Sequence, residues 1–96
     1  MLATLLVQPP PAVDAVSHAN GDVDVTWDAS PSAASRPLEY AVLRRAPGGS
    51  FAQIARTAAL RITDAPGNGT FDYAVRALIS SFISADSPVA TAVVPP

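Results

Sequence analysis

The sequence predicts an all-β domain, built either as a sandwich or as a small barrel. Apolar residues alternate with polar ones along several short runs, and turn-forming residues separate these runs at short intervals. No window keeps the apolar spacing of a helix, so almost no helix is expected. The 96 residues correspond to about one domain with one core.

The first half of the chain contains the clearest alternation. In residues 22–28 the positions of Val23, Val25 and Trp27 share one parity, and the acidic and hydroxyl residues share the other. This pattern predicts a strand with one buried face. Strands are expected in this half at 12–17, 22–28 and 38–45.

The second half repeats the pattern with different side chains. Phe71, Tyr73, Val75 and Ala77 alternate with polar or small residues. Breakers such as Asn20-Gly21 and Pro47-Gly48-Gly49 bound the runs. The remaining strands are expected at 51–56, 60–64, 70–78 and 87–94, which makes seven in all.

The order and spacing of these pieces resemble the fibronectin type III domain, especially its bacterial versions. The resemblance spans roughly residues 10–94 and implies a seven-stranded immunoglobulin-like β-sandwich. The matching pieces are Val-Thr-Trp at 25–27, Tyr-Ala-Val-Leu-Arg at 40–44, Pro-Gly-Gly-Ser-Phe at 47–51, Ile-Thr-Asp at 62–64 and the run at 69–77.

Three aromatic residues are assigned to the core. Trp27 is large enough to span much of the space between two sheets that lie about 10 Å apart. Tyr40 and Tyr73 lie on the apolar parity of their strands. The resemblance further implies that Tyr73 forms a tyrosine corner, in which the hydroxyl bonds to upstream backbone.

The stretch at 78–84 is apolar where the resembled family has a polar loop. Two interpretations of Ile79, Phe82 and Ile83 stay open. In the first, Phe82 or Ile83 caps the open end of the core or begins the last strand early; in the second, the three residues form a contact for an adjacent domain or a second copy.

Catalysis and cofactor binding have no support in the sequence. There is no cysteine, and His18 is the single histidine, expected in a solvated turn. No Gly-x-Ser-x-Gly motif is present. Asp22, Asp24 and Asp28 could offer calcium ligands, but carboxylates on an outer strand face are usually solvated or paired with arginines. We therefore expect a non-enzyme without metal or cofactor.

Charge and hydropathy exclude further classes of partner. The chain has six arginines and no lysine, with a formal net charge of −2, and its only adjacent basic pair is Arg44-Arg45, expected at a solvated strand end. Nucleic-acid binding is therefore not expected. No apolar run is long enough for membrane insertion. Asn68-Gly69-Thr70 matches the N-glycosylation acceptor sequence, and we interpret Asn68 and Gly69 as turn formers.

Proline clusters bracket the predicted domain and are typical of semi-rigid spacers. Residues 1–9 are interpreted as a linker or the end of a preceding segment, 10–94 as the domain and 95–96 as the start of a C-terminal linker. The resemblance implies a non-catalytic accessory module, a spacer or interdomain contact in a larger, secreted bacterial protein such as a polysaccharide-degrading enzyme. This implies an extracellular or cell-surface location, with neighbouring domains as partners.

Two other functions remain open at the sequence level. One is a protein-recognition module that uses the loops at one end of the sandwich. The other is direct polysaccharide binding, which needs exposed aromatic rings. Once Trp27, Tyr40 and Tyr73 are assigned to the core, only Phe51, Phe71 and Phe82 are left for such a platform.

Overall fold

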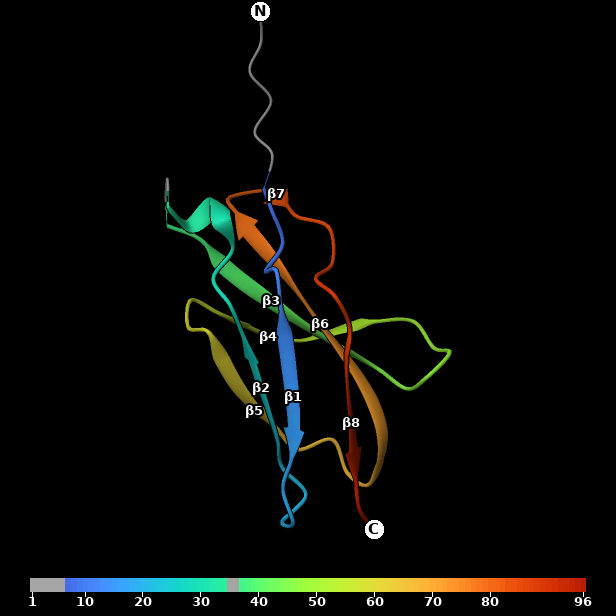
Figure 1. Cartoon of the computed structure of the whole chain (residues 1–96). Helices are drawn as coiled ribbons and strands as arrows, with labels where there is room; N and C mark the ends of the chain where they lie inside the picture. The colour runs from blue at the N-terminus through green and yellow to red at the C-terminus, as the bar shows by residue number, and fades with distance from the viewer. Residues whose placement is uncertain (1–6, 35–36) are drawn as a thin grey trace, which may run out of the picture.

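Two antiparallel sheets pack face to face in the computed structural model, which describes residues 7–34 and 37–96 (Figure 1). The smaller sheet has the order β1-β2-β5, with β1 (Val13–Ser17), β2 (Val23–Trp27) and β5 (Arg61–Asp64). The larger sheet has the order β4-β3-β6-β7, and β8 also pairs with β6. Its strands are β3 (Glu39–Arg45), β4 (Ala52–Thr57), β6 (Gly69–Ile79), β7 (Phe82–Ile83) and β8 (Ala90–Val94). The fold is therefore a sandwich and not a small barrel.

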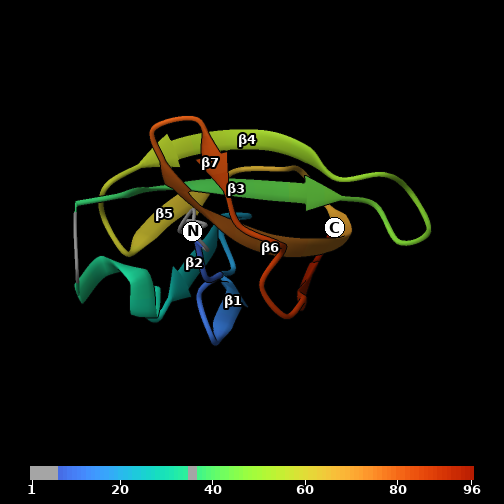
Figure 2. The ribbon, with the colours of Figure 1, turned by 90° about the horizontal axis from the view of Figure 1, so that it is seen from above.

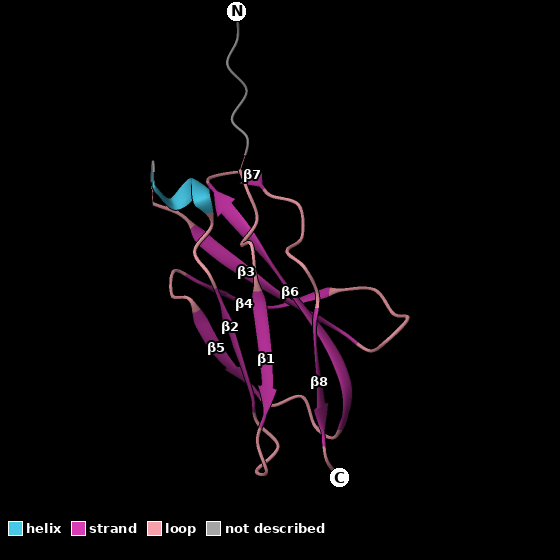
Figure 3. Ribbon diagram, viewed as in Figure 1, coloured by secondary structure: helices cyan, strands magenta, loops and turns pink. Residues whose placement is uncertain are grey.

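The expected strands are all present, with small changes at their ends. The last strand begins at Ala90 rather than at 87, and the two-residue strand β7 was not expected. Helical structure within the described residues is limited to the 3-10 helix η1 (Pro31–Ala34), shown in cyan in Figure 3.

The period-two pattern places the core between the sheets. On β2, Val23, Val25 and Trp27 are buried, while the residues between them are half-buried on the outer face. Alternate residues of the long strand β6 face the core in the same way. The central residues are Val7, Val23, Val25, Trp27, Tyr40, Val42, Tyr73, Val75, Ala77, Ile79, Ala92 and Val94.

The folded body begins before the expected boundary at residue 10. Val7 is 5% exposed and belongs to the core cluster. The Gln8 backbone N–H donates to Ser32 Oγ at 3.0 Å, and the Gln8 carbonyl accepts a bond from the Ser30 hydroxyl. Residues 7–9 therefore pack on the sandwich, although the sequence alone assigns them to a preceding segment, and residues 1–6 of that segment lie outside the described part.

The two ends of the described chain lie at opposite ends of the sandwich. The described chain begins at the end that carries β7 and η1, and its C-terminus lies at the other end, beside the turn before β6 (Figure 1). Figure 2 looks down this long axis and shows the two sheets as separate layers.

Candidate contact surface at the end of the sandwich

The apolar stretch after β6 forms a tight hairpin. Ser80 and Ser81 make a two-residue loop, and Ser80 has a φ of 53°, in the left-handed region that such hairpin loops require. Leu78 then pairs with Ile83, and Ile79 pairs with Phe82. This hairpin brings the three predicted contact residues together at one end of the molecule.

Ile79 belongs to the core and not to the surface. It is 6% exposed, because it shares the inward parity of Tyr73, Val75 and Ala77 on β6. Ile79 is therefore not accessible to a partner, which corrects the expectation that it forms part of a contact surface.

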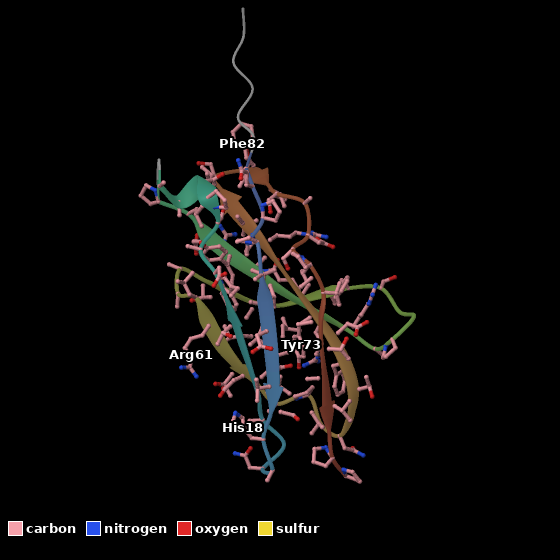
Figure 4. The ribbon with its side chains drawn as sticks, viewed as in Figure 1. His18, Arg61, Tyr73 and Phe82 are labelled. Carbon is pink, nitrogen blue, oxygen red and sulfur yellow. The ribbon has the colours of Figure 1, made fainter. Side chains whose placement is uncertain are left out.

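Phe82 and Ile83 are exposed. Their exposed fractions are 49% and 62%, so neither caps the core, and neither begins the last strand. Residues paired across antiparallel strands share a face, so Phe82 lies on the inner side with Ile79, just beyond the end of the core, and Ile83 on the outer side with Leu78. Figure 4 shows Phe82 at the end where the described chain enters.

A groove of about 340 Å³ lies on the outer face next to this hairpin. Leu78, the partner of Ile83, is one of its walls, and the ion pair between Arg56 and Glu39 lies at its rim with N–O separation 3.0 Å. Phe82, Ile83 and this groove together are named the entry surface. The groove is lined by Pro37, Leu38, Glu39, Arg56, Ala58, Leu78 and Ser80.

Two buried serines explain why the last strand starts late. Ser84 and Ser87 are 6% and 4% exposed. The hydroxyl of Ser84 accepts from Ala77 N–H at 2.9 Å and its own N–H donates to the Ala77 carbonyl; Ser87 does the same for Val75. These bonds satisfy β6 where no regular strand lies beside it. Sequence reasoning missed them, because no local pattern in residues 84–88 marks these serines as buried.

The two tyrosines of the core have different hydrogen-bond partners. Tyr40 is 2% exposed, and its hydroxyl accepts from the backbone N–H of Ser30 at 3.0 Å. Tyr73 is fully buried, and its hydroxyl donates to the Asp64 carboxylate at 2.7 Å. The expectation of a bond from Tyr73 to backbone is therefore corrected, because a charged acceptor on β5 lies within reach and makes a stronger bond.

Asp64 also connects the two sheets. The Nη1 atom of Arg44 on β3 donates to both oxygens of this carboxylate, at 2.7 and 3.0 Å. The guanidinium of Arg44 also lies 5.6 Å from the centre of the Phe71 ring. Burial, followed by the hydrogen bond to Asp64, raises the pKa of Tyr73 above its ordinary value. The cluster is a structural clamp between the sheets.

Arg45 is the centre of a second polar cluster, on the outer face of the larger sheet. Its Nε donates to Asp72 at 3.0 Å, and its guanidinium lies 4.3 Å from the centre of the Phe51 ring. Thr91 donates to the other Asp72 oxygen at 2.8 Å, so β3, β6 and β8 are joined. The hydrogen bond from Thr91, followed by that from Arg45, lowers the pKa of Asp72. Arg44 and Arg45 are thus paired rather than simply solvated.

Asp24 is the centre of a polar cluster on the smaller sheet. Its carboxylate accepts from Thr63 at 2.9 Å and lies 2.8 Å from His18 Nε2 and 3.7 Å from Arg61 Nη2. The hydrogen bonds with His18 and Thr63 lower the pKa of Asp24. Figure 4 shows His18 and Arg61 on this side of the molecule.

The acidic residues at the start of β2 are engaged in other hydrogen bonds. Asp22 bonds to Asn20 of its own turn, and Asp24 is occupied by the donors given above. Over residues 7–34 and 37–96, no group of three or more His, Cys, Asp or Glu side chains is placed to hold a metal ion.

No protein-family model and no curated protein matches this chain. Among solved structures, it is similar to an Fn3-like protein from Clostridium thermocellum, with 26% identity and a TM-score of 0.77 over 96% of this chain and 97% of that one. The chain folds as a fibronectin type III domain. The fold that the resemblance implied is therefore confirmed.

Other fibronectin type III domains share the fold at lower identity. The protein FN3tt is similar with a TM-score of 0.76 and 14% identity over 96% of this chain and 98% of that one. The twitchin kinase region of C. elegans is similar with a TM-score of 0.82 and 18% identity. The match covers 95% of this chain and 17% of the twitchin chain. The twitchin region shows a domain of this fold as one part of a longer chain.

The described residues contain no helix that is long and apolar enough to cross a membrane.

Proposed function

We propose that this fibronectin type III domain is a non-catalytic spacer and interdomain contact module in a larger, secreted bacterial protein, such as a polysaccharide-degrading enzyme. The observation that carries the proposal is that the chain enters and leaves at opposite ends of the sandwich (Figure 1). The strand β6 of 11 residues implies a separation of about 36 Å at ~3.3 Å per residue. Domains attached at the two ends are held apart by that rigid length.

The comparisons and the composition support this role. The similarity to a bacterial Fn3-like protein supports the bacterial setting, and the twitchin region is an example of such a domain inside a multidomain chain. The proline pair at 95–96 stiffens the connection after the domain, whereas the run at 9–11 lies within the folded body, where Pro10 is fully buried. The secreted location and the type of parent enzyme are part of the proposal.

The spacer role is tested by the distribution of distances between the two flanking domains. Spin labels on the flanking domains of the parent protein report this distribution by pulsed electron resonance. We expect a narrow distribution with this domain in place. A Gly/Ser chain of equal residue number behaves as a coil of about 5–6 Å × √n and should give a broad one. Equal widths would refute the spacer role.

The entry surface supplies the interdomain contact. Phe82 and Ile83 are 49% and 62% exposed and lie at the end where the chain enters, so the domain that precedes this one is the partner in reach. Aromatic side chains such as that of Phe82 are enriched at protein–protein interfaces. We therefore assign the contact to the preceding neighbour and not to the following one.

A matched pair of variants tests this assignment. Phe82→Ser with Ile83→Ser should broaden the distance distribution between this domain and the preceding one. Val93→Ser removes a side chain that is also 62% exposed but lies on β8, whose end leads to the other end of the sandwich, and should leave that distribution unchanged. If both variants behave alike, the entry surface is not the contact.

A separate protein is the second candidate for this surface, because the same two exposed side chains suit recognition in trans. Sedimentation of the isolated domain with and without the preceding domain added in trans separates the two cases. Polysaccharide binding is less favoured. Phe51 and Phe71 lie against arginine side chains, which leaves Phe82 as the one strongly exposed aromatic of the described chain.

A further inference from the structure

The chain has two asparagines, and a glycine follows each of them. These are Asn20-Gly21 and Asn68-Gly69. Asn20 and Gly21 lie in the turn between β1 and β2, whereas Asn68 lies in the connection before β6 and Gly69 is the first residue of that strand. The glycine has a positive φ in both pairs, 93° at Gly21 and 131° at Gly69. Because the reacting pair is Asn-Gly in both cases, we attribute a difference in reactivity mainly to the folded surroundings.

Asn20 is held in a hydrogen-bonded turn. Its Oδ1 accepts from the Asp22 backbone N–H at 3.0 Å, and its Nδ2 donates to an Asp22 carboxylate oxygen at 3.2 Å. The backbone N–H of Gly21 donates to the His18 carbonyl at 3.0 Å. The side-chain amide and the backbone nitrogen that follows it are both occupied.

Asn68 lies in different surroundings. It is exposed in a bend, and within the part of the chain that the structure describes its side-chain amide makes no hydrogen bond. Residues 65–68 take part in none of the turn or loop backbone bonds. Gly69 is the first residue of β6, where it pairs with Val94 at the end of the ladder, and ladder ends open most easily.

We propose that Asn68 is a site of spontaneous deamidation and that the fold protects Asn20 from the same reaction. The backbone nitrogen of Gly69 attacks Cγ of Asn68. A bond forms between these atoms, the bond from Cγ to Nδ2 breaks, and ammonia leaves with the proton from the glycine nitrogen. Water then opens the cyclic imide at either carbonyl, which gives aspartate or isoaspartate.

The products change the end of the domain from which the chain leaves. Either product adds a negative charge to an already acidic chain. Isoaspartate also lengthens the main chain by one methylene directly before β6, beside the final residues of β8. Any domain that follows would meet this altered end.

Peptide mapping by mass spectrometry after incubation of the native full chain in mildly alkaline buffer tests the proposal. We expect Asn68 to convert at least about fivefold faster than Asn20, since one net hydrogen bond that must open before attack accounts for a factor of that size. In strong denaturant the two rates should become similar, because both pairs lose their surroundings.

Two variants complete the test. Asn68→Gln should abolish conversion at 68, because its longer side chain disfavours the ring, and should leave Asn20 slow. Asp22→Ala removes one of the bonds that hold Asn20 and should accelerate conversion at 20 alone. Equal rates in the native chain, faster conversion at Asn20, or an unchanged Asn68 after a time in which the denatured chain converts would overturn the proposal.

Discussion

At the scale of single residues, the partner of a buried hydroxyl follows from what lies opposite it. Tyr40 meets a backbone N–H from Ser30, whereas Tyr73 meets the carboxylate of Asp64. The carboxylate is itself held by Arg44, so the phenol donates to a charged group in a fixed position. Removing the Tyr73 hydroxyl leaves the Arg44–Asp64 ion pair in place, but the Asp64 carboxylate loses one hydrogen bond.

The pH dependence of Tyr73 is open to direct measurement. Its pKa is raised in the folded state from the ordinary 10.0, so its contribution to stability is fully present below pH 10.0 and is lost as pH rises above that value, where the unfolded chain ionises first. The chain has no lysine, and arginine stays protonated, so few other side chains titrate there.

We expect Tyr73→Phe to lower the free energy of unfolding by about 1–2 kcal/mol at neutral pH. Between about pH 9 and 11 the variant should then lose less stability than the parent chain. Urea denaturation across this range measures both effects. Equal losses in the two proteins would contradict the assignment of the shift to Tyr73.

Trp27 makes a second residue-scale prediction. It is 5% exposed, its ring centre lies 5.6 Å from that of Tyr40, and within the described chain its Nε1 has no hydrogen-bond partner. Trp27→Ala should lower stability by about 3–5 kcal/mol through the cavity it creates.

Trp27→Phe is the matched control for this cavity. Phenylalanine keeps an aromatic ring in the core and removes only an indole N–H that makes no hydrogen bond. The loss of unfolding free energy should therefore be less than half of the loss in the alanine variant. Chemical denaturation compares the two. If phenylalanine costs as much as alanine, the loss is not explained by the cavity alone.

At the scale of elements, β6 organises the larger sheet. Its two sides are completed by β3, β7 and β8, and the gap between β7 and β8 is filled by Ser84 and Ser87. The hairpin that begins with Ile79 therefore combines buried and exposed apolar residues within a few positions.

Substitutions in this hairpin should separate the buried residue from the exposed pair. Ile79→Ala should lower stability by about 2–5 kcal/mol, because Ile79 is 6% exposed. Phe82→Ser with Ile83→Ser should change it by less than about 1 kcal/mol, because both side chains already contact water. Thermal or urea unfolding of the isolated domain measures the difference. A large loss in the double variant would mean that the pair packs on the core.

At the scale of the whole molecule, the arginines are neutralised in place. Each of the five arginines in the described residues lies within ion-pair distance of an aspartate or glutamate, and the net charge of the chain is −2. The surface of this part therefore presents no unpaired basic patch, and a polyanion would have to displace existing carboxylates.

Duplex DNA and heparin should consequently not bind the domain at physiological salt. Electrophoretic mobility and heparin chromatography are the measurements, with a basic protein of similar size as the positive control. Retention that decreases with added salt would show that the ion pairs open to polyanions.

The fold was predictable because its strands are local patterns. The alternation around Val23, Val25 and Trp27 requires one buried face whatever the partner strand is, and Asn-Gly and Pro-Gly-Gly pairs require turns. These constraints depend on residues close in sequence. They located each expected strand to within a few residues, and the resemblance in order and spacing then indicated the sandwich.

The candidate surface was predictable only in part. The apolar composition of 78–84 indicated an unusual connection, but which of its residues are buried depends on the register of Ile79 and Phe82 across a hairpin. A shift of one residue would exchange the inner and outer faces. The left-handed Ser80 sets that register, and no strong turn signal such as Asn-Gly marks it in the sequence.

By itself the sequence determined the all-β class, the parity of the core residues, and the absence of cysteine and lysine. The tertiary structure alone decided that Tyr73 bonds Asp64, that Ser84 and Ser87 take the place of a strand, and that Ile79 is buried while Phe82 is not. The physical reason is that parity is set by neighbours along a strand, whereas hydrogen-bond partners and exposure are set by residues that meet only after the sheets have packed.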